Sequence, residues 1–365
     1  RYTYLADPVA NPDTTEKEAS ELWAFAAAIL PRVNSCDPAV AAVLRANADI
    51  TSADAPMTDG YATVKADLET VYECMGITCE YVGGLVDVDA VDGGYVADFA
   101  PCVDGATASG DFEAIAGYTP VSDVSEHAAL DQDMAVMEAE ADKRSDEGFA
   151  AAYTIYSVGA NSAKSDSTRT IQGFSTEAPG KLTGETYFDM WAGYWGAEDY
   201  ADRFTASACN GTGNFTGESD LTRSEGCLKG AQYQNVWMYV VHELEDAISD
   251  CEAGDTDRND GSVIAWDEGW AFYAGSLEGA AVGGTEDEGQ MLYALAEKRC
   301  ENFMTCSGDN DGDDLSGVSA VNKDILAKWQ TGQSNIQELD CVSAKAIKED
   351  IVALMIVPLV QGVLR

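Results

Sequence analysis

The chain of 365 residues is long enough for one large domain or for two fused halves. It carries 64 Asp and Glu residues against 21 Lys and Arg residues, a formal net charge of −43. This balance argues against nucleic acid as a partner, because phosphate binding needs clustered Lys and Arg. It favours cations as ligands, although solubility in a salty medium explains a strongly acidic surface equally well.

Helical periodicity covers most of the N-terminal half of the sequence. It predicts helices over residues 16–34, 39–48, 61–73 and 125–160, the last with a break around Ser145. Residues 80–120 are rich in Gly and Val and predict loops with at most a small hairpin. The polar segment that follows Ala160 is the expected connection to the second half.

The C-terminal half continues the same pattern. It predicts helices over residues 186–206, 232–250, 266–279, 288–303, 319–330 and 343–363. The apolar run at 351–364 is too short to span a membrane and contains Pro358, so we expect a core helix and no membrane span. Because strand patterns are scarce, the fold class is predicted to be mostly α, a helical bundle with little β.

Two halves are suggested by an imperfect internal repeat. The segment 146–150, which includes Glu147, echoes the segment 267–271, and each is preceded by one of the two histidines. Both histidines begin a His-x-x-x-Asp pattern. We therefore expect related helical halves at 1–165 and 186–365, joined by 166–185 and facing each other across a cleft.

The ten cysteines predict five disulfides and no free thiol, because the number is even and the positions look paired. Close or bracketing pairs are Cys74 with Cys79, Cys300 with Cys306, and Cys209 with Cys227. The loop between the last two holds N-glycosylation acceptors at Asn210 and Asn214. Disulfides persist in oxidising compartments, so we expect a protein secreted to the periplasm or cell surface, with Arg1 as a mature N-terminus.

The stretch 266–279 combines an aromatic stripe with three carboxylates. Asp267, Glu268 and Glu278 share a helix face with small residues, while Tyr273 falls on the aromatic stripe. Buried carboxylates need a counter-charge, so a cation is one natural partner. The alternative is an acidic face that points at water.

A second candidate lies on the preceding helix, where an apolar run ends at His242. Glu245 and Asp246 lie three and four residues further on, on the same face, so the three side chains could share a metal. The alternative is a single histidine hydrogen-bonded to Asp246. His127 and Asp131 become candidates only through the repeat, because their surroundings are polar and predict a solvated helix.

Other patterns weigh against catalysis. The acidic loops at 255–261 and 309–314 approximate calcium loops, but their glycines are misplaced. The sequence contains no nucleophile elbow, no zinc-protease motif and no phosphate-binding glycine loop. We expect a binding protein and not an enzyme.

The segments 241–247 and 266–279 resemble the algal iron-assimilation proteins, the low-iron-inducible periplasmic proteins of green algae and the marine phytotransferrins. The resemblance is strongest over 232–306. It implies a secreted or surface protein that captures ferric iron, with carbonate as synergistic anion and a cell-surface uptake partner. Marine relatives can carry a C-terminal membrane anchor, and without one a soluble scavenger is expected.

The resulting hypothesis is a ferric site of carboxylate, histidine and tyrosine ligands. We expect convergence on one polar pocket between two adjacent helices of His242, Glu245, Asp246, Asp267, Glu268 and Glu278, with Tyr273 as a neighbour and His127, Asp131 and Glu147 as further candidates from the repeat. The alternative function is a calcium-binding or structural acidic cell-surface glycoprotein without iron.

Overall fold

The computed structural model confirms the mostly α fold. It describes residues 12–48, 61–75, 77, 79–85, 114–164, 167–256, 261–285, 288–307 and 315–365. The helices before the midpoint are α2 (Pro12–Cys36), α3 (Pro38–Ala48), α4 (Tyr61–Met75), α5 (Cys79–Val82), α6 (Ser125–Ala128), α7 (Leu130–Ala141), α8 (Asp146–Val158), α9 (Gly173–Thr176) and α10 (Ala178–Lys181).

The second part of the chain is also helical. It contains α11 (Thr186–Trp195), α12 (Tyr200–Asn210), η1 (Gly213–Phe215), α13 (Asp220–Gly230), η2 (Ala231–Val236), α14 (Trp237–Ala253), α15 (Ser262–Ala274), η3 (Ser276–Glu278), α16 (Leu292–Phe303), α17 (Ala320–Gln337) and α18 (Cys341–Leu364). In the described ranges, the strands are β1 (Cys306–Ser307) and β2 (Val318–Ser319), which pair antiparallel with Cys306 opposite Ser319.

Several expected boundaries shift for identifiable reasons. The break near Ser145 is confirmed, because the Ser145 hydroxyl accepts a hydrogen bond from the Gly148 amide and caps α8. The helix expected over 186–206 is two helices, since Gly196 takes a left-handed conformation at φ 66° and ends α11. The helix expected over 232–250 belongs to a longer run, because α13, the π-helical η2 and α14 follow one another directly.

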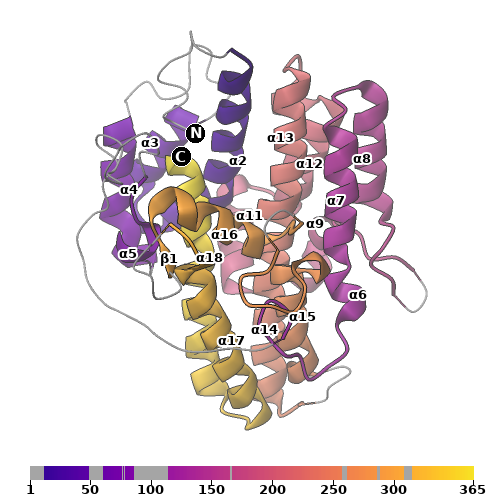
Figure 1. Cartoon of the computed structure of the whole chain (residues 1–365), viewed down its shortest axis with the longest axis vertical. Coiled ribbons are helices and arrows are strands. Elements are labelled where there is room, and N and C mark those ends of the chain that lie inside the picture. The colour runs from indigo at the N-terminus through magenta and orange to yellow at the C-terminus, as the bar shows by residue number, and fades with distance from the viewer. Residues whose placement is uncertain are drawn as a thin grey trace.

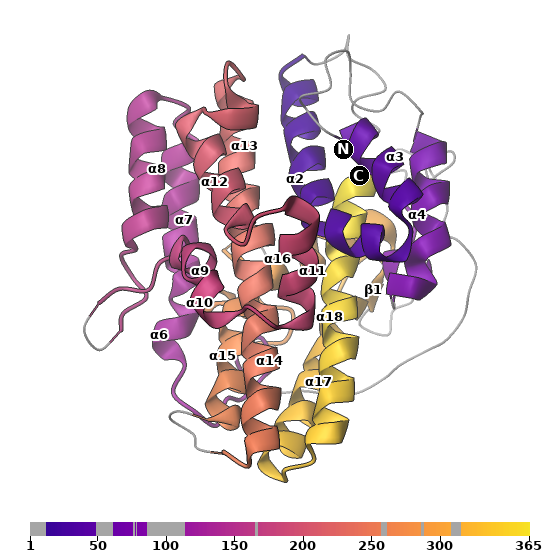
Figure 2. The same cartoon turned by 180° about the vertical axis from the view of Figure 1, so that it is seen from behind.

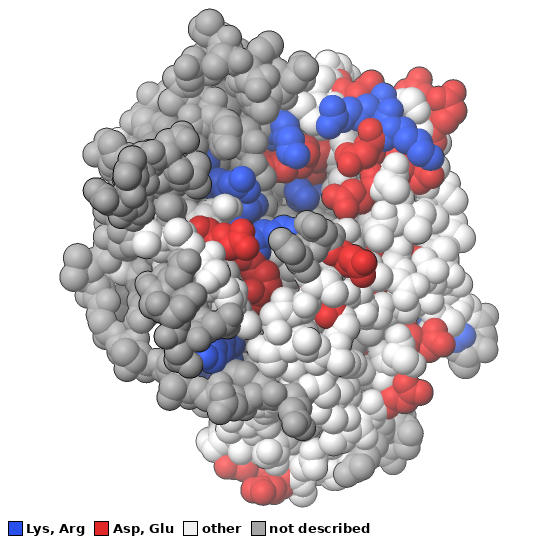
Figure 3. Space-filling view, viewed as in Figure 1, with Lys and Arg blue, Asp and Glu red and all other residues white. Residues whose placement is uncertain are grey.

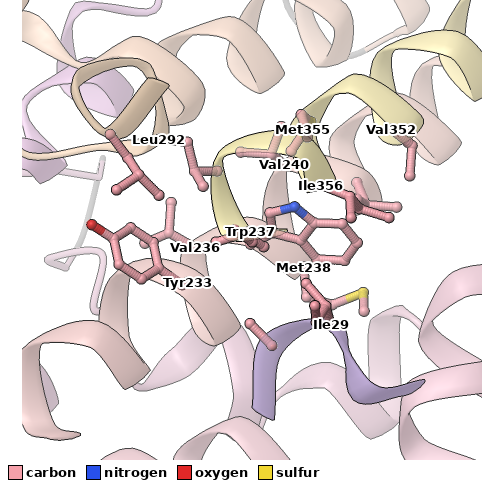
Figure 4. Close-up of a cluster of buried hydrophobic side chains, with 14 of the residues drawn as sticks. Ile29, Tyr233, Val236, Trp237, Met238, Val240, Leu292, Val352, Met355 and Ile356 are labelled. Carbon is pink, nitrogen blue, oxygen red and sulfur yellow. The ribbon is translucent and has the colours of Figure 1, made fainter. Parts of the chain in front are cut away.

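The long helices lie side by side in the molecule. In Figures 1 and 2, α7, α8, α12 and α13 form one side of the upper part, and α14 and α15 lie beside α17 and α18 in the lower part. The helix α2 packs against both α13 and α18. Figure 4 shows Trp237 of α14 surrounded by apolar side chains that include Ile29 of α2 and Ile356 of α18.

One core cluster draws residues from both of the predicted halves. It joins Leu22 and Met134 to Trp237 and Met355, all of which are buried. The stacked rings of Trp191 and Trp237, with centroids 5.1 Å apart, tie α11 to α14. The two predicted halves therefore share one hydrophobic core. The division into repeated halves remains a prediction.

Disulfide bonds crosslink the helical framework. The bonds Cys209–Cys227 and Cys300–Cys306 confirm two expected pairs, whereas Cys251–Cys341 joins residues 90 apart in the sequence. Cys36 and Cys79 are also disulfide-bonded, and no free thiol occurs in the described ranges. The side chain of Cys74 lies outside the described residues.

The disulfide loop after α12 presents both glycosylation acceptors to solvent. Asn210 is the last residue of α12, Asn214 lies in η1, and both side chains are exposed. Glycosylation at these positions remains a prediction. None of the described helices combines the length and the apolar character that crossing a bilayer requires.

Candidate metal centre

The helices α14 and α15 pack closely along their length, because small residues of α15 face α14. A Cβ atom built on Gly269 would lie 3.5 Å from the Cβ atom of Glu243. The acidic stretch of α15 therefore faces another helix on one side and not bulk water. Polar groups at this contact must find partners within the protein.

Two histidine–glutamate pairs lie at the contact between α14 and α15. The Nε2 atom of His127, in α6, lies 3.0 Å from the Oε1 atom of Glu268 in α15. The Nδ1 atom of His242, in α14, lies 2.6 Å from the Oε1 atom of Glu185, just before α11. The opposite ring nitrogen of His127, Nδ1, is buried without a hydrogen-bond partner.

An aromatic group connects the two pairs. The ring centroid of Phe272 lies 5.6 Å from that of His127 and 5.4 Å from that of Tyr239. The Tyr239 centroid lies 5.1 Å from that of His242. The only two histidines of the chain, 115 positions apart in the sequence, therefore border one aromatic group.

A buried carboxyl group and a guanidinium complete the arrangement. Glu243 is 5 % exposed, and burial followed by the charge of Glu268 raises the pKa of its carboxyl well above the usual range. Arg169 lies with its Cζ atom 5.6 Å from the Phe272 centroid and donates a hydrogen bond of 2.9 Å from Nη1 to the Ser162 hydroxyl. Burial lowers the pKa of Arg169, and Glu268 opposes that shift.

We call this set the His–Glu cluster, and it consists of His127, Arg169, Glu185, Tyr239, His242, Glu243 and Glu268. Burial also raises the pKa of the Tyr239 phenol, and the nearby Glu243 and Glu268 add to the shift. The set offers carboxylate, imidazole and phenol donors together with one guanidinium, on which the charges of Glu268 and Glu243 act. Within the described part of the chain, no three His, Cys, Asp or Glu side chains are already gathered as a metal-binding group.

The structure places Asp267 outside this cluster. Its fully buried carboxylate accepts hydrogen bonds from the Tyr118 hydroxyl, from the amides of Val121 and Ser122 at 2.8 Å each, and from the Gln333 amide at 3.0 Å. These contacts hold the segment before α6 against α15 and α17. These hydrogen bonds are a sufficient structural explanation for a carboxylate at position 267.

A second buried polar region contains Asp131, Tyr273 and Glu278. Asp131 accepts hydrogen bonds from the Ser276 hydroxyl at 2.7 Å and the Leu277 amide at 2.5 Å, and burial raises its pKa to about 6. Burial also raises the pKa of Glu278 to about 7, although the carboxylate accepts a hydrogen bond from Thr285.

Tyr273 belongs to the same region and not to the His–Glu cluster. Its hydroxyl donates a hydrogen bond to the Asn322 side chain at 2.5 Å, and its ring stacks on that of Trp329. Burial raises the pKa of its phenol well above the usual range. The placement on the aromatic stripe, expected from the sequence, is confirmed.

The remaining expected residues lie on other surfaces. Glu245 pairs at 2.7 Å with the buried Lys348 of α18, while Asp246 and Glu147 are exposed. The expected convergence on one pocket is thus limited to His127, His242 and Glu268. The alternative pairing of His242 with Asp246 is also replaced, because Glu185 takes that position.

Sequence reasoning missed Arg169, Glu185, Tyr239 and Glu243. Tyr239 and Glu243 could have been found from the sequence. Residues four apart share a helix face, and these two flank the end of the apolar run. Arg169 and Glu185 lie in the polar connecting region, where no local pattern marks them. The candidate calcium loops fall largely on residues 257–260 and 308–314, which lie outside the described residues.

Comparison with known proteins gives one match. A family model described as low iron-inducible periplasmic protein matches residues 94–348, a range that contains the whole His–Glu cluster. No curated protein and no solved structure matches the chain.

Proposed function

Because the chain belongs to the low iron-inducible periplasmic protein family, we propose that it binds ferric iron at the His–Glu cluster and concentrates it for an uptake partner at the cell surface. The disulfides fit the oxidising compartment that the family description names. The observation that carries the proposal is the meeting of both histidines, each paired with a glutamate, around Phe272 and Tyr239.

The donor chemistry suits a hard trivalent cation. Carboxylate oxygens favour hard cations, and imidazole is a common iron ligand. Metal-binding histidines usually hold their second ring nitrogen against a carboxylate, which fixes the orientation of the ring. Glu185 stands in that relation to His242, which leaves the Nε2 atom of this imidazole for a ligand.

Charge favours a bound cation as well. Glu185, Glu243 and Glu268 bring three carboxyl groups to a partly buried site, where the charges of Arg169 and Lys181 act on Glu243. A cation that neutralises buried carboxylates removes the energetic cost of leaving them unpaired. Arg169 also offers a positive charge to an anion, so the proposal includes carbonate as a synergistic anion.

Ferric binding requires side-chain movement in this proposal. Glu268 must turn from its contact with His127, and Glu243 must lose its proton, before three donors can share one ion. Glu268 is adjacent in sequence to Gly269, and a Cβ atom on Gly269 would lie 3.5 Å from the Cβ atom of Glu243, so these two side chains start from neighbouring backbone positions. The proposal assigns the rearrangement to side-chain rotation.

The test is a ferric titration, with a competing chelator, of the wild type, His127→Ala and His242→Ala. Removing either histidine is expected to lower the affinity by about tenfold to 100-fold. Glu147→Gln serves as the matched control, because Glu147 is exposed on α8 and is not part of the cluster, and it should bind as the wild type does. Unchanged affinity in both histidine variants would remove the His–Glu cluster from the proposal.

A further inference from the structure

A separate cavity of about 320 Å³ opens between α7, α13, η2 and α16. This volume is at the lower end of the range for small-molecule sites. The charged side chains around it are Lys229, Lys298, Arg299, Arg365, Glu138 and Glu301. None of the residues that line it belongs to the His–Glu cluster.

The charge of this cavity is opposite to that of the protein. The whole chain has 64 acidic and 21 basic residues, whereas the described residues that line the cavity include four basic and two acidic ones. Basic residues still outnumber acidic ones around the cavity if Arg365, the last residue of the sequence, is left out. Figure 3 shows Lys and Arg side chains gathered near the middle of this face, with acidic side chains beside them.

The protein holds part of this positive charge in fixed positions. Arg299 is only 4 % exposed, its Cζ atom lies 5.5 Å from the Phe25 centroid, and Nη1 donates to the Asn302 side chain at 3.4 Å. The Nζ atom of Lys229 lies 5.8 Å from the Tyr233 centroid. A guanidinium held by packing loses little entropy when it binds an anion.

The N-terminus of α16 adds partial positive charge to the cavity. Met291, which lines the cavity, precedes the first residue of α16 and makes no side-chain capping bond. The amides of a first helical turn carry partial positive charge. Lys298, two turns further along the same helix, brings an exposed ammonium to the rim of the cavity.

We propose that this cavity binds a small anion with more than one negative charge, carried on carboxylate or phosphate groups. Fixed and mobile cations around a cavity of this size can contact several oxygens of one such ligand at once. A singly charged carboxylate would contact fewer of these cations. We expect this site to bind its anion independently of iron, because none of the described residues that line it belongs to the His–Glu cluster.

The test is calorimetric titration of the metal-free protein with inorganic phosphate, citrate and acetate at low ionic strength. We expect phosphate or citrate to bind at least tenfold more tightly than acetate, and the tighter of the two identifies the group recognised. The double variant Lys229→Gln with Lys298→Gln should weaken that binding by about tenfold or more. Neither change deletes a buried apolar side chain, so the fold is expected to persist.

Two control variants make the result specific. Lys345→Gln removes an exposed lysine elsewhere, which pairs with Glu252 at 3.1 Å, and should leave anion binding unchanged. His242→Ala should also leave it unchanged. The proposal is overturned if neither phosphate nor citrate binds, if the double variant binds as tightly as the wild type, or if His242→Ala abolishes binding.

Discussion

Replacement of Asp267 by alanine is expected to lower the free energy of unfolding by about 3 kcal/mol or more, because several hydrogen-bond donors lose their shared acceptor. The carboxylate is fully buried and accepts hydrogen bonds from Tyr118, Val121, Ser122 and Gln333. Alanine would leave the buried Tyr118 hydroxyl and three partly buried donors without this acceptor, and a fully buried donor costs about 1–3 kcal/mol. Urea unfolding of the metal-free variant and wild type measures the difference.

Asp246→Ala is the matched control for this experiment. Asp246 is exposed on the neighbouring helix, so its removal should change stability by no more than about 0.5 kcal/mol. Asp267→Asn keeps an acceptor oxygen and should lose less stability than Asp267→Ala while binding iron normally. If Asp267→Ala unfolds like the wild type and Asp267→Asn loses iron, Asp267 is a ligand and not an anchor.

Replacement of Glu243 by glutamine is expected to lower ferric affinity by about 100-fold at neutral pH and to flatten its dependence on pH. Burial and the charge of Glu268 raise the pKa of Glu243, so the metal-free protein holds this carboxyl protonated at a higher pH than usual. Iron binds the carboxylate form and must release that proton. Wild-type affinity should therefore rise with pH and fall on acidification.

The glutamine variant has no proton to release at this position. A plot of the logarithm of affinity against pH should consequently be shallower by about one proton over the range in which Glu243 titrates. Glu252→Gln, an exposed change on the same helix, should keep both the affinity and the slope of the wild type. A Glu243→Gln protein with wild-type affinity and slope would contradict a ligand role for this residue.

The helical architecture could be read from the sequence because its causes are local. Apolar spacing indicated the helices α14 and α15, although the helix expected over 266–279 begins at Ser262 and ends at Ala274. The break expected around Ser145 coincides with the start of α8. The helix expected over 186–206 was wrong for a local reason, because the left-handed Gly196 ends α11 within a stretch of continuous apolar spacing. The Cys251–Cys341 bond could not be assigned, because spacing cannot select a partner 90 residues away.

The candidate site was only partly predictable, because its contacts join distant segments. The repeat drew attention to His127 together with Asp131, whereas the structure pairs His127 with Glu268 across 141 positions. Asp131 instead holds the turn after α15. A helix pattern cannot distinguish a carboxylate that binds metal from Asp267, which binds backbone amides of another segment.

The central claim is that iron binds between α14 and α15, and crystals of the ferric-loaded protein test it most directly. An anomalous difference map recorded at the iron absorption edge locates the ion without any assumption about its ligands. The account predicts one dominant peak bounded by His127, His242, Glu243 and Glu268. A dominant peak at Glu278, at the acidic loops 255–261 or 309–314, or no peak at all, would contradict it.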